Sequence, residues 1–213
     1  PFVYVTDDFG ASWRSISAGL PNQPVNVIVE DRVNPNLLFV GNETGIFVSI
    51  DRGAHWTKMN NNMPNVPVRD MVIHPRQNDL VAGSYGRGIF VTNITPLQEL
   101  NDAVLGRDAY LFKTPPAVQR ITWSFGANDY LFGQRNFQTP NEQNGMAIRY
   151  YLKTAAPAGA AIRIANAAGQ EVACLAGRAN AGINSVLWSM RNGGGGGGRG
   201  GGRGGGGGAG GAG

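Results

Sequence analysis

The chain has 213 residues, of which 33 are glycine and one is cysteine, and its formal net charge is +4. Two of these charges, Arg199 and Arg203, lie in a glycine-rich tail, so the remainder carries about +2 (+4 less these two) and lacks the basic footprint of a nucleic-acid-binding domain. No apolar run approaches the roughly 18 residues of a transmembrane helix, so we expect no membrane span.

A short motif occurs twice in the first third of the chain. It reads T-x-D-x-G-x-x-W and then S-x-D-x-G-x-x-W, 43 residues later, at Thr6, Asp8, Gly10, Trp13 and at Ser49, Asp51, Gly53, Trp56. The carboxylate can accept hydrogen bonds from nearby N–H groups, the hydroxyl can bond across the same turn, and the glycine allows a positive φ. The tryptophan is expected to bury its ring beside the next strand. We therefore assign these eight residues structural roles in tight turns between strands.

The flanks of the motif repeat with the same period. Residues 3–6 match residues 46–49 and again 89–92, although the third copy of the turn has decayed to N-I-T-P. A period of 40 to 50 residues with short β-rich runs is typical of a β-propeller with four strands per blade. Strands are predicted at 25–30, 37–40, 46–49, 57–59, 68–73, 80–82 and 89–92.

About two blades fit into residues 1–94, whereas closed propellers have roughly 4 to 8. We expect the missing blades to lie upstream of Pro1, and any signal peptide to lie with them.

The paired motifs resemble the Asp-box, or bacterial neuraminidase repeat, found in the β-propellers of sialidases, sortilins and xyloglucan-cleaving glycosidases. The resemblance implies the C-terminal part of a bacterial exported protein, sortilin-like or glycosyl-hydrolase-like, that is secreted, periplasmic or on the cell surface.

The repeat pattern stops near residue 95, and residues 95–144 are predicted to be a linker and loop region. A short helix or linker is expected at 96–100, a strand at 109–113, and a long loop at 120–144. Strand-like runs return at 146–152, 161–164, 170–174 and 184–188. The single cysteine, Cys174, lies in an apolar run and is predicted to be a small buried hydrophobic residue, with a reactive or metal-binding thiol as the alternative.

Residues 145–192 resemble an immunoglobulin-type sandwich of the flagellar hook-cap kind. The resemblance rests on Ile164, Gly169, Val172, Gly182, Asn184, Val186 and Trp188. The tail, residues 193–213, contains 17 glycines, two alanines and two arginines and is predicted to be disordered. A flexible linker or low-complexity insertion explains it better than RNA binding, because it has no aromatic residue.

Ligands of such propellers usually meet the face opposite the Asp-boxes, where the second and third strands of each blade are joined. We therefore predict Asn42, Glu43, Tyr85 and Arg87 as ligand-binding residues, with the loop at 60–67 on the same face. Glu43 could act as an acid or base, but glycoside hydrolysis by the common route needs two carboxylates about 5 to 9.5 Å apart. These turns hold only one, and the alternative is that Glu43 is solvated and that Arg87 packs or bonds locally.

The sequence has no Ser-His-Asp set, phosphate loop or cysteine metal site, and His55 and His74 lie in different kinds of turn. We therefore predict no catalytic residue, metal or cofactor within this chain. The expected function is a non-catalytic binding or scaffold role toward a protein or glycan. The alternative is part of an exported glycosyl hydrolase whose catalytic acids lie on upstream blades.

Overall fold

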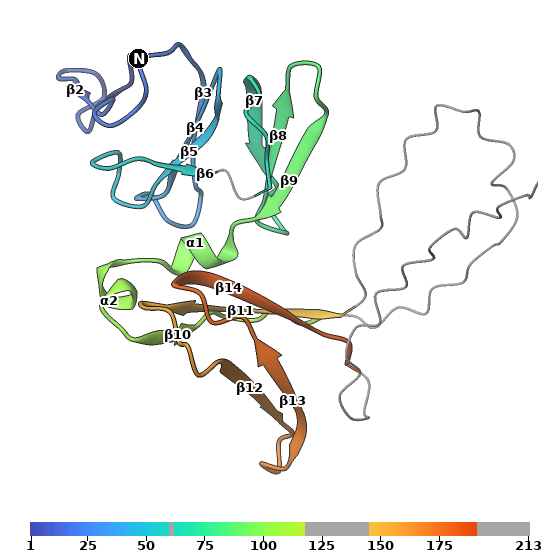
Figure 1. Ribbon diagram of the computed structural model, residues 1–213. Helices are drawn as coiled ribbons and strands as arrows, with labels where there is room; N and C mark the ends of the chain where they lie inside the picture. The colour runs from blue at the N-terminus through green and yellow to red at the C-terminus, as the bar shows by residue number, and fades with distance from the viewer. Residues whose placement is uncertain (60–61, 118–144, 191–213) are drawn as a thin grey trace, which may run out of the picture.

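The computed structural model describes residues 1–59, 62–117 and 145–190. Within these ranges the chain is all-β: its strands form antiparallel sheets, and two short helices lie between them (Figure 1). The all-β class predicted from the sequence is thus confirmed. No helix in this described part is long and apolar enough to cross a bilayer. The loop predicted at 120–144 and the tail at 193–213 fall outside the described residues.

Residues 1–94 form three antiparallel units that follow one another along the chain. β1 (Tyr4–Val5) pairs with β2 (Arg14–Ser15) in a hairpin. The next four strands form one sheet in chain order: β3 (Val25–Glu30), β4 (Leu38–Asn42), β5 (Gly45–Ser49) and β6 (Thr57–Met59). The last three form a second sheet: β7 (Val68–Ile73), β8 (Asp79–Ser84) and β9 (Ile89–Asn93). All seven strands predicted between residues 25 and 92 are present, with ends that differ by at most two residues.

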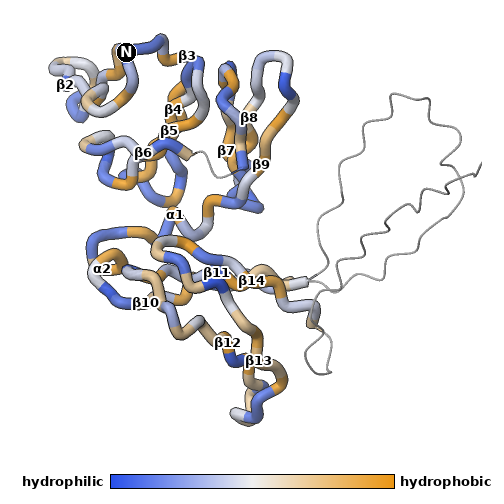
Figure 2. The backbone as a smooth tube through the Cα atoms, in the orientation of Figure 1, coloured by the Kyte–Doolittle hydropathy of each residue, from blue (hydrophilic) through white to orange (hydrophobic). Residues whose placement is uncertain are grey.

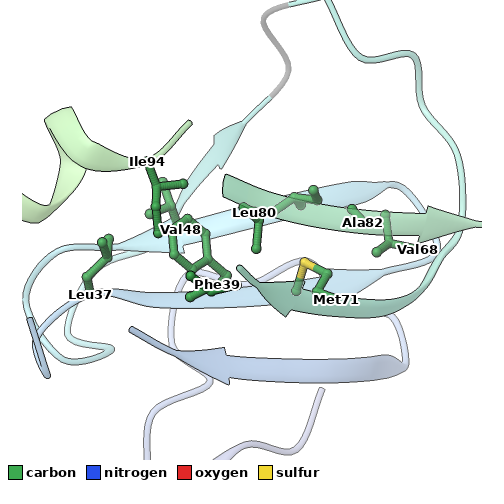
Figure 3. Packing of buried hydrophobic residues seen from close by; sticks show 10 residues of the cluster. Leu37, Phe39, Val48, Val68, Met71, Leu80, Ala82 and Ile94 are labelled. Atoms are coloured by element: carbon green, nitrogen blue, oxygen red, sulfur yellow. The ribbon is translucent and has the colours of Figure 1, made fainter. Parts of the chain in front are cut away.

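The β3–β6 sheet is covered on both faces, because successive side chains of a strand point to opposite sides. On one face, Leu38 packs with Val3 and Ile16 of the β1–β2 hairpin. On the other, Phe39 and Val48 meet the β7–β9 sheet in the largest apolar cluster (Figure 3). Its buried members are Leu37, Phe39, Ile46, Val48, Val68, Met71, Ile73, Leu80, Ala82 and Ile94. Figure 2 shows that the strands carry most of the hydrophobic residues of these units.

Glycine is required where β4 passes closest to the neighbouring sheet. A Cβ at Gly41 would lie 2.7 Å from Val27 Cγ1 and 2.8 Å from Val68 Cγ1, well inside van der Waals contact. At Gly83, the equivalent position of the next repeat, the nearest atom to such a Cβ is Asp70 O at 3.8 Å. The close approach of the two sheets therefore depends on the first glycine and not on the second.

Two short helices, α1 (Thr95–Glu99) and α2 (Asp102–Leu105), follow β9. The short helix predicted at 96–100 agrees with α1 to within a residue. The sequence interpretation did not predict α2, whose N-terminus is capped by Asn101: its side-chain oxygen accepts a hydrogen bond from Val104 N at 3.0 Å.

Helix α1 is fixed against the turn between β3 and β4. The buried Asp31 carboxylate accepts a hydrogen bond from Gln98 Nε2 at 2.9 Å, and Asn34 Nδ2 donates to Gln98 O at 3.1 Å. The same carboxylate accepts from Asn34 N at 2.8 Å, so its burial is compensated by hydrogen bonds. These bonds hold α1, where the C-terminal part begins, against the β3–β6 sheet.

The C-terminal part of the described chain, after α2, consists of a three-stranded sheet and a hairpin. Strands β10 (Ala109–Leu111), β11 (Met146–Leu152) and β14 (Gly182–Trp188) form the sheet, in the order β10-β11-β14. Strands β12 (Ala160–Ala165) and β13 (Glu171–Gly177) form the hairpin. The Tyr150 hydroxyl of β11 donates to Arg178 O at the end of β13, which ties the two together. The strands predicted at 109–113, 146–152, 161–164, 170–174 and 184–188 thus all exist, with shifted ends.

The prediction that Cys174 is buried is wrong, because this side chain is exposed. Paired residues of neighbouring strands share a face, and Cys174 is paired with Arg163, whose side chain is 78% exposed. A bulge between Ile164 and Ala165 shifts the pairing next to Val172. The extra residue changes which alternate positions face inward, so the apolar run could not reveal the orientation of the cysteine.

Candidate functional site

The second of the two turns that resemble an Asp-box, between β5 and β6, is held by its own side chains. The Ser49 hydroxyl donates to Asp51 Oδ1 at 2.7 Å and accepts from Gly53 N at 2.8 Å. Asp51 Oδ1 also accepts from His55 N at 2.9 Å, and its Oδ2 lies 2.6 Å from His55 Nδ1. Gly53 has a φ of 84°, a conformation that side chains disfavour.

The first box, between β1 and β2, repeats this network with one partner changed. The Thr6 hydroxyl donates to Asp8 Oδ1 and accepts from Gly10 N, both at 2.8 Å. Asp8 Oδ1 accepts from Ser12 N at 2.8 Å, and Asp8 Oδ2 accepts from the Ser12 hydroxyl at 2.6 Å. Ser12 therefore occupies the place that His55 has in the second box.

These hydrogen bonds lower the pKa of both carboxyl groups. The Ser12 hydroxyl, the Ser12 N–H and the Thr6 hydroxyl together lower the pKa of Asp8 from its ordinary 3.8 to about 2. For Asp51, partial burial acts to raise the pKa, but hydrogen bonds from His55 N–H and the Ser49 hydroxyl outweigh it and lower the pKa overall. Both carboxylates are engaged within their turns, an arrangement that suits a structural role and not proton transfer.

The two tryptophans of the boxes differ in their surroundings. Trp56 Nε1 donates to Ile16 O at 2.7 Å, and the ring packs on the apolar cluster beneath the β1–β2 hairpin. Trp13 is 63% exposed, contrary to the expectation that its ring is buried. The hairpin that covers Trp56 belongs to the preceding repeat, and no described residue takes that place beside Trp13. An ion pair between Arg52 and Asp7 further joins the two boxes.

At the opposite end of the sheets, Asn42 and Glu43 lie in the turn between β4 and β5. Asn42 is almost fully buried, and its Oδ1 accepts hydrogen bonds from Thr44 N at 2.8 Å and the Thr44 hydroxyl at 3.0 Å. The structure thus places Asn42 inside the turn, where its oxygen stabilises the chain reversal. The Glu43 side chain is only half-buried, and it contacts the β7–β9 sheet through Arg69.

Glu43 forms an ion pair between the two sheets. Arg69 Nη1 of β7 donates to Glu43 Oε1 at 2.9 Å, and Asn26 Nδ2 of β3 donates to the same oxygen at 3.1 Å. Asn26 Nδ2 also donates to Val68 O at 3.0 Å, so this amide bridges β3 and β7. The Glu43 carboxylate is thus engaged by an arginine and an amide of two neighbouring strands, and it links the two sheets.

Tyr85 and Arg87, in the turn between β8 and β9, complete this end of the sheets. The Arg69 guanidinium lies 5.6 Å from the centre of the Tyr85 ring, within the range of a cation–π contact. Tyr85 is 72% exposed, and its N–H donates to Pro67 O at 2.9 Å, which fixes the turn. Arg87 is exposed and has no hydrogen-bond or ion-pair partner among the described residues.

The structure therefore brings Glu43 and Tyr85 together through Arg69, places Arg87 in the same turn as Tyr85, and buries Asn42. Sequence reasoning missed Asn26 and Arg69. They occupy equivalent positions 43 residues apart, each at a bulge near the start of the first strand of its sheet. Bulges redirect side chains, and the available signal is a polar residue that follows the first valine of the strand in both repeats, Val25 and Val68.

The two histidines lie away from this end of the sheets. His55 belongs to the second Asp-box, and His74 Nδ1 accepts a hydrogen bond from Gln77 N at 3.2 Å in the turn between β7 and β8. Within the described ranges, no three side chains of the histidine, cysteine or acidic kind converge as metal ligands.

Comparison of the chain with family models, with curated proteins and with solved structures found no match.

Proposed function

We propose that residues 1–94 are blades of a β-propeller and that the chain is a non-catalytic binding and scaffold part of an exported protein. The ligand, a protein or a glycan, meets the end that carries Tyr85, Arg69 and Arg87. Three successive antiparallel units with a common period, packed face to face with β3 next to β7, support the propeller. In the C-terminal part, the β10-β11-β14 sheet is tied to the β12–β13 hairpin through Tyr150, which supports an immunoglobulin-type spacer.

The hydrogen-bond partners of Glu43 are the main support for a non-catalytic function. It is the one carboxylate in the two turns, and Arg69 and Asn26 occupy the same oxygen at 2.9 and 3.1 Å. A glycosidase acid at this position would need an unpaired carboxyl group and a second carboxyl partner. An exposed tyrosine in contact with Arg69, with the exposed Arg87 in the same turn, instead offers a flat ring and hydrogen-bond donors, which suit recognition.

Binding of the 213-residue chain to a glycan array tests this proposal. Tyr85→Ala and Arg87→Ala should each weaken glycan binding by about tenfold. Arg76→Ala, an exposed arginine in the turn between β7 and β8 at the other end of the sheet, should leave binding unchanged.

Release of new reducing ends from a bound glycan would overturn the non-catalytic assignment. Glycan binding that Tyr85→Ala and Arg87→Ala leave intact would overturn the location of the site. If no glycan binds, the glycan part of the proposal is rejected.

A further inference from the structure

The positive charge beside the Tyr85 ring is neutralised by Glu43. Arg69 Nη1 donates to Glu43 Oε1 at 2.9 Å, and Arg69 Nη2 donates to Glu43 Oε2 at 3.4 Å, so the guanidinium and the carboxylate contact each other through both oxygens. The same guanidinium lies 5.6 Å from the centre of the Tyr85 ring. A guanidinium paired in this way with a carboxylate has no net charge, so the ring lies beside a neutral pair and not beside a free cation.

Asn26 holds this ion pair in place. Exposed ion pairs often contribute little, because two long side chains lose conformational freedom when they pair. Here the Asn26 amide bonds both partners: Nδ2 donates to Glu43 Oε1 at 3.1 Å, and Oδ1 accepts from Arg69 Nη1 at 3.3 Å. Nδ2 also donates to Val68 O at 3.0 Å, which anchors the amide to the backbone of β7. The pair is therefore fixed, and its Arg69 and Glu43 side chains are only 49% and 33% exposed.

Arg87 differs from Arg69 in this respect. It is exposed, and it has no hydrogen-bond or ion-pair partner among the described residues. A cation in open solvent attracts anions weakly, because water and salt screen its charge. Its N–H donors serve the uncharged hydroxyl groups of a ligand as well as an anion. Arg87 alone therefore does not select an acidic ligand.

The chemistry around Tyr85 favours a sugar over a protein surface. The centre of a protein interface is apolar, whereas the neighbours of Tyr85 in its turn are Ser84, Gly86, Arg87 and Gly88. A Cβ added at Gly86 or Gly88 would meet no atom within 4 Å, so the turn projects into open space. The Tyr85 residue is 72% exposed. A flat ring bordered by hydrogen-bond donors matches a sugar, which presents C–H groups on the faces of its ring and hydroxyl groups around it.

We propose, resting on the glycan-binding function proposed above, that Glu43 determines the specificity of this site and makes it select uncharged sugars over acidic ones. A sugar that packs on Tyr85 lies beside Arg69. The carboxylate of a uronic acid there would be attracted by Arg69 and repelled by Glu43. Because these two charges are in hydrogen-bond contact, their effects on a third charge largely cancel. The acidic sugar would thus lose part of the hydration of its carboxylate without gaining an ionic partner, a cost that an uncharged sugar does not have.

A glycan array of matched pairs tests the proposal. Each pair consists of a neutral oligosaccharide and the same oligosaccharide with its C6 hydroxymethyl groups oxidised to carboxylates. The 213-residue chain should bind the neutral members at least about threefold more tightly. Glu43→Gln keeps the size of the side chain and removes its charge. It should strengthen binding of the acidic members about tenfold and change that of the neutral members by less than about twofold, because Arg69 is then free to pair with the ligand.

Two further variants separate the charge of Arg69 from a general change in net charge. Glu30→Gln removes the same charge from an exposed residue at the opposite end of β3 and should leave the preference for neutral members unchanged. Arg69→Ala combined with Glu43→Gln should abolish the gain in binding of acidic members. Far-ultraviolet circular dichroism of each variant checks that it is folded.

The outcomes distinguish this proposal from the function on which it rests. A preference of the unaltered chain for acidic members would overturn the proposal but leave glycan binding standing, and this measurement needs no variant to fold. No gain of acidic binding in folded Glu43→Gln, or the same gain in Glu30→Gln, would also overturn it. Binding of no member of any pair would instead reject the glycan-binding function, and the specificity proposal with it.

Discussion

The β3–β6 and β7–β9 sheets are built from the same repeat, yet only the first is covered on both faces. Phe39 and Val48 are 0% and 8% exposed, whereas Val91, the equivalent of Val48, is 61% exposed. The residue types are similar, and the strands have the same register. Burial at a given repeat position is thus decided by the neighbouring unit and not by the strand itself, as expected where each repeat contacts mainly its neighbours.

The tryptophans of the two Asp-boxes give the sharpest measure of this difference. Trp56→Ala removes a ring packed beneath the β1–β2 hairpin and the hydrogen bond to Ile16 O, so the free energy of unfolding should fall by about 3 kcal/mol. Trp13→Ala removes a largely exposed ring and should cost less than about 1 kcal/mol. Urea denaturation followed by far-ultraviolet circular dichroism measures both. Equal losses would show that the hairpin does not stabilise the box that follows it.

Replacing the glycine of each box by alanine should likewise destabilise the second box more than the first. Gly53 and Gly10 both have positive φ, at 84° and 94°, so alanine at either position costs about 1 kcal/mol in backbone strain. At Gly53 the new Cβ would also lie 2.8 Å from Ile16 Cβ, whereas at Gly10 the nearest atom, in Trp13, is 3.8 Å away. Gly53→Ala should therefore cost about 2 to 3 kcal/mol and Gly10→Ala about 1 kcal/mol. Thermal unfolding of both variants against the unaltered chain is the test, and a larger loss for Gly10→Ala would contradict it.

The strands of the repeated units could be predicted from the sequence because their signals are local. Short apolar runs bounded by turn residues mark β3 to β9, and the side chains of the two boxes bond within a few residues of one another. Two aspartates 43 residues apart both accept a hydrogen bond from the hydroxyl two residues before them and from the backbone N–H four residues after them, since these groups repeat with them. Local chemistry of this kind needs no knowledge of the rest of the fold.

The candidate site could be predicted only in part because its contacts cross between sheets. Glu43 and Tyr85 are joined by Arg69, a residue of another strand that a bulge redirects. Asn42 stands beside Glu43 in sequence, but its side chain turns inward to bond Thr44. Whether the side chain of a turn residue faces solvent depends on backbone geometry, and a single sequence does not specify that geometry. The exposure of Trp13 was missed for a related reason, since burial of its ring depends on a neighbouring unit.

The smallest predicted effect concerns the residue that differs between the boxes, Ser12 in the first and His55 in the second. The pKa of Asp8 is about 2, below its ordinary 3.8, so this carboxylate stabilises the fold fully above about pH 4 and stops doing so as the pH falls through 2. Ser12→Ala removes the strongest contribution, the hydroxyl bond of 2.6 Å, but keeps the bonds from Ser12 N and Thr6. The pKa of Asp8 should then rise toward 3.8 without reaching it, and the pH at which stability declines should rise with it. Titration of the Asp8 carboxyl carbon by NMR measures the shift. Ser12→Thr keeps the hydroxyl and should leave the pKa near 2, whereas an unchanged pKa in Ser12→Ala would show that the Ser12 N–H and the Thr6 hydroxyl suffice to lower the pKa of Asp8.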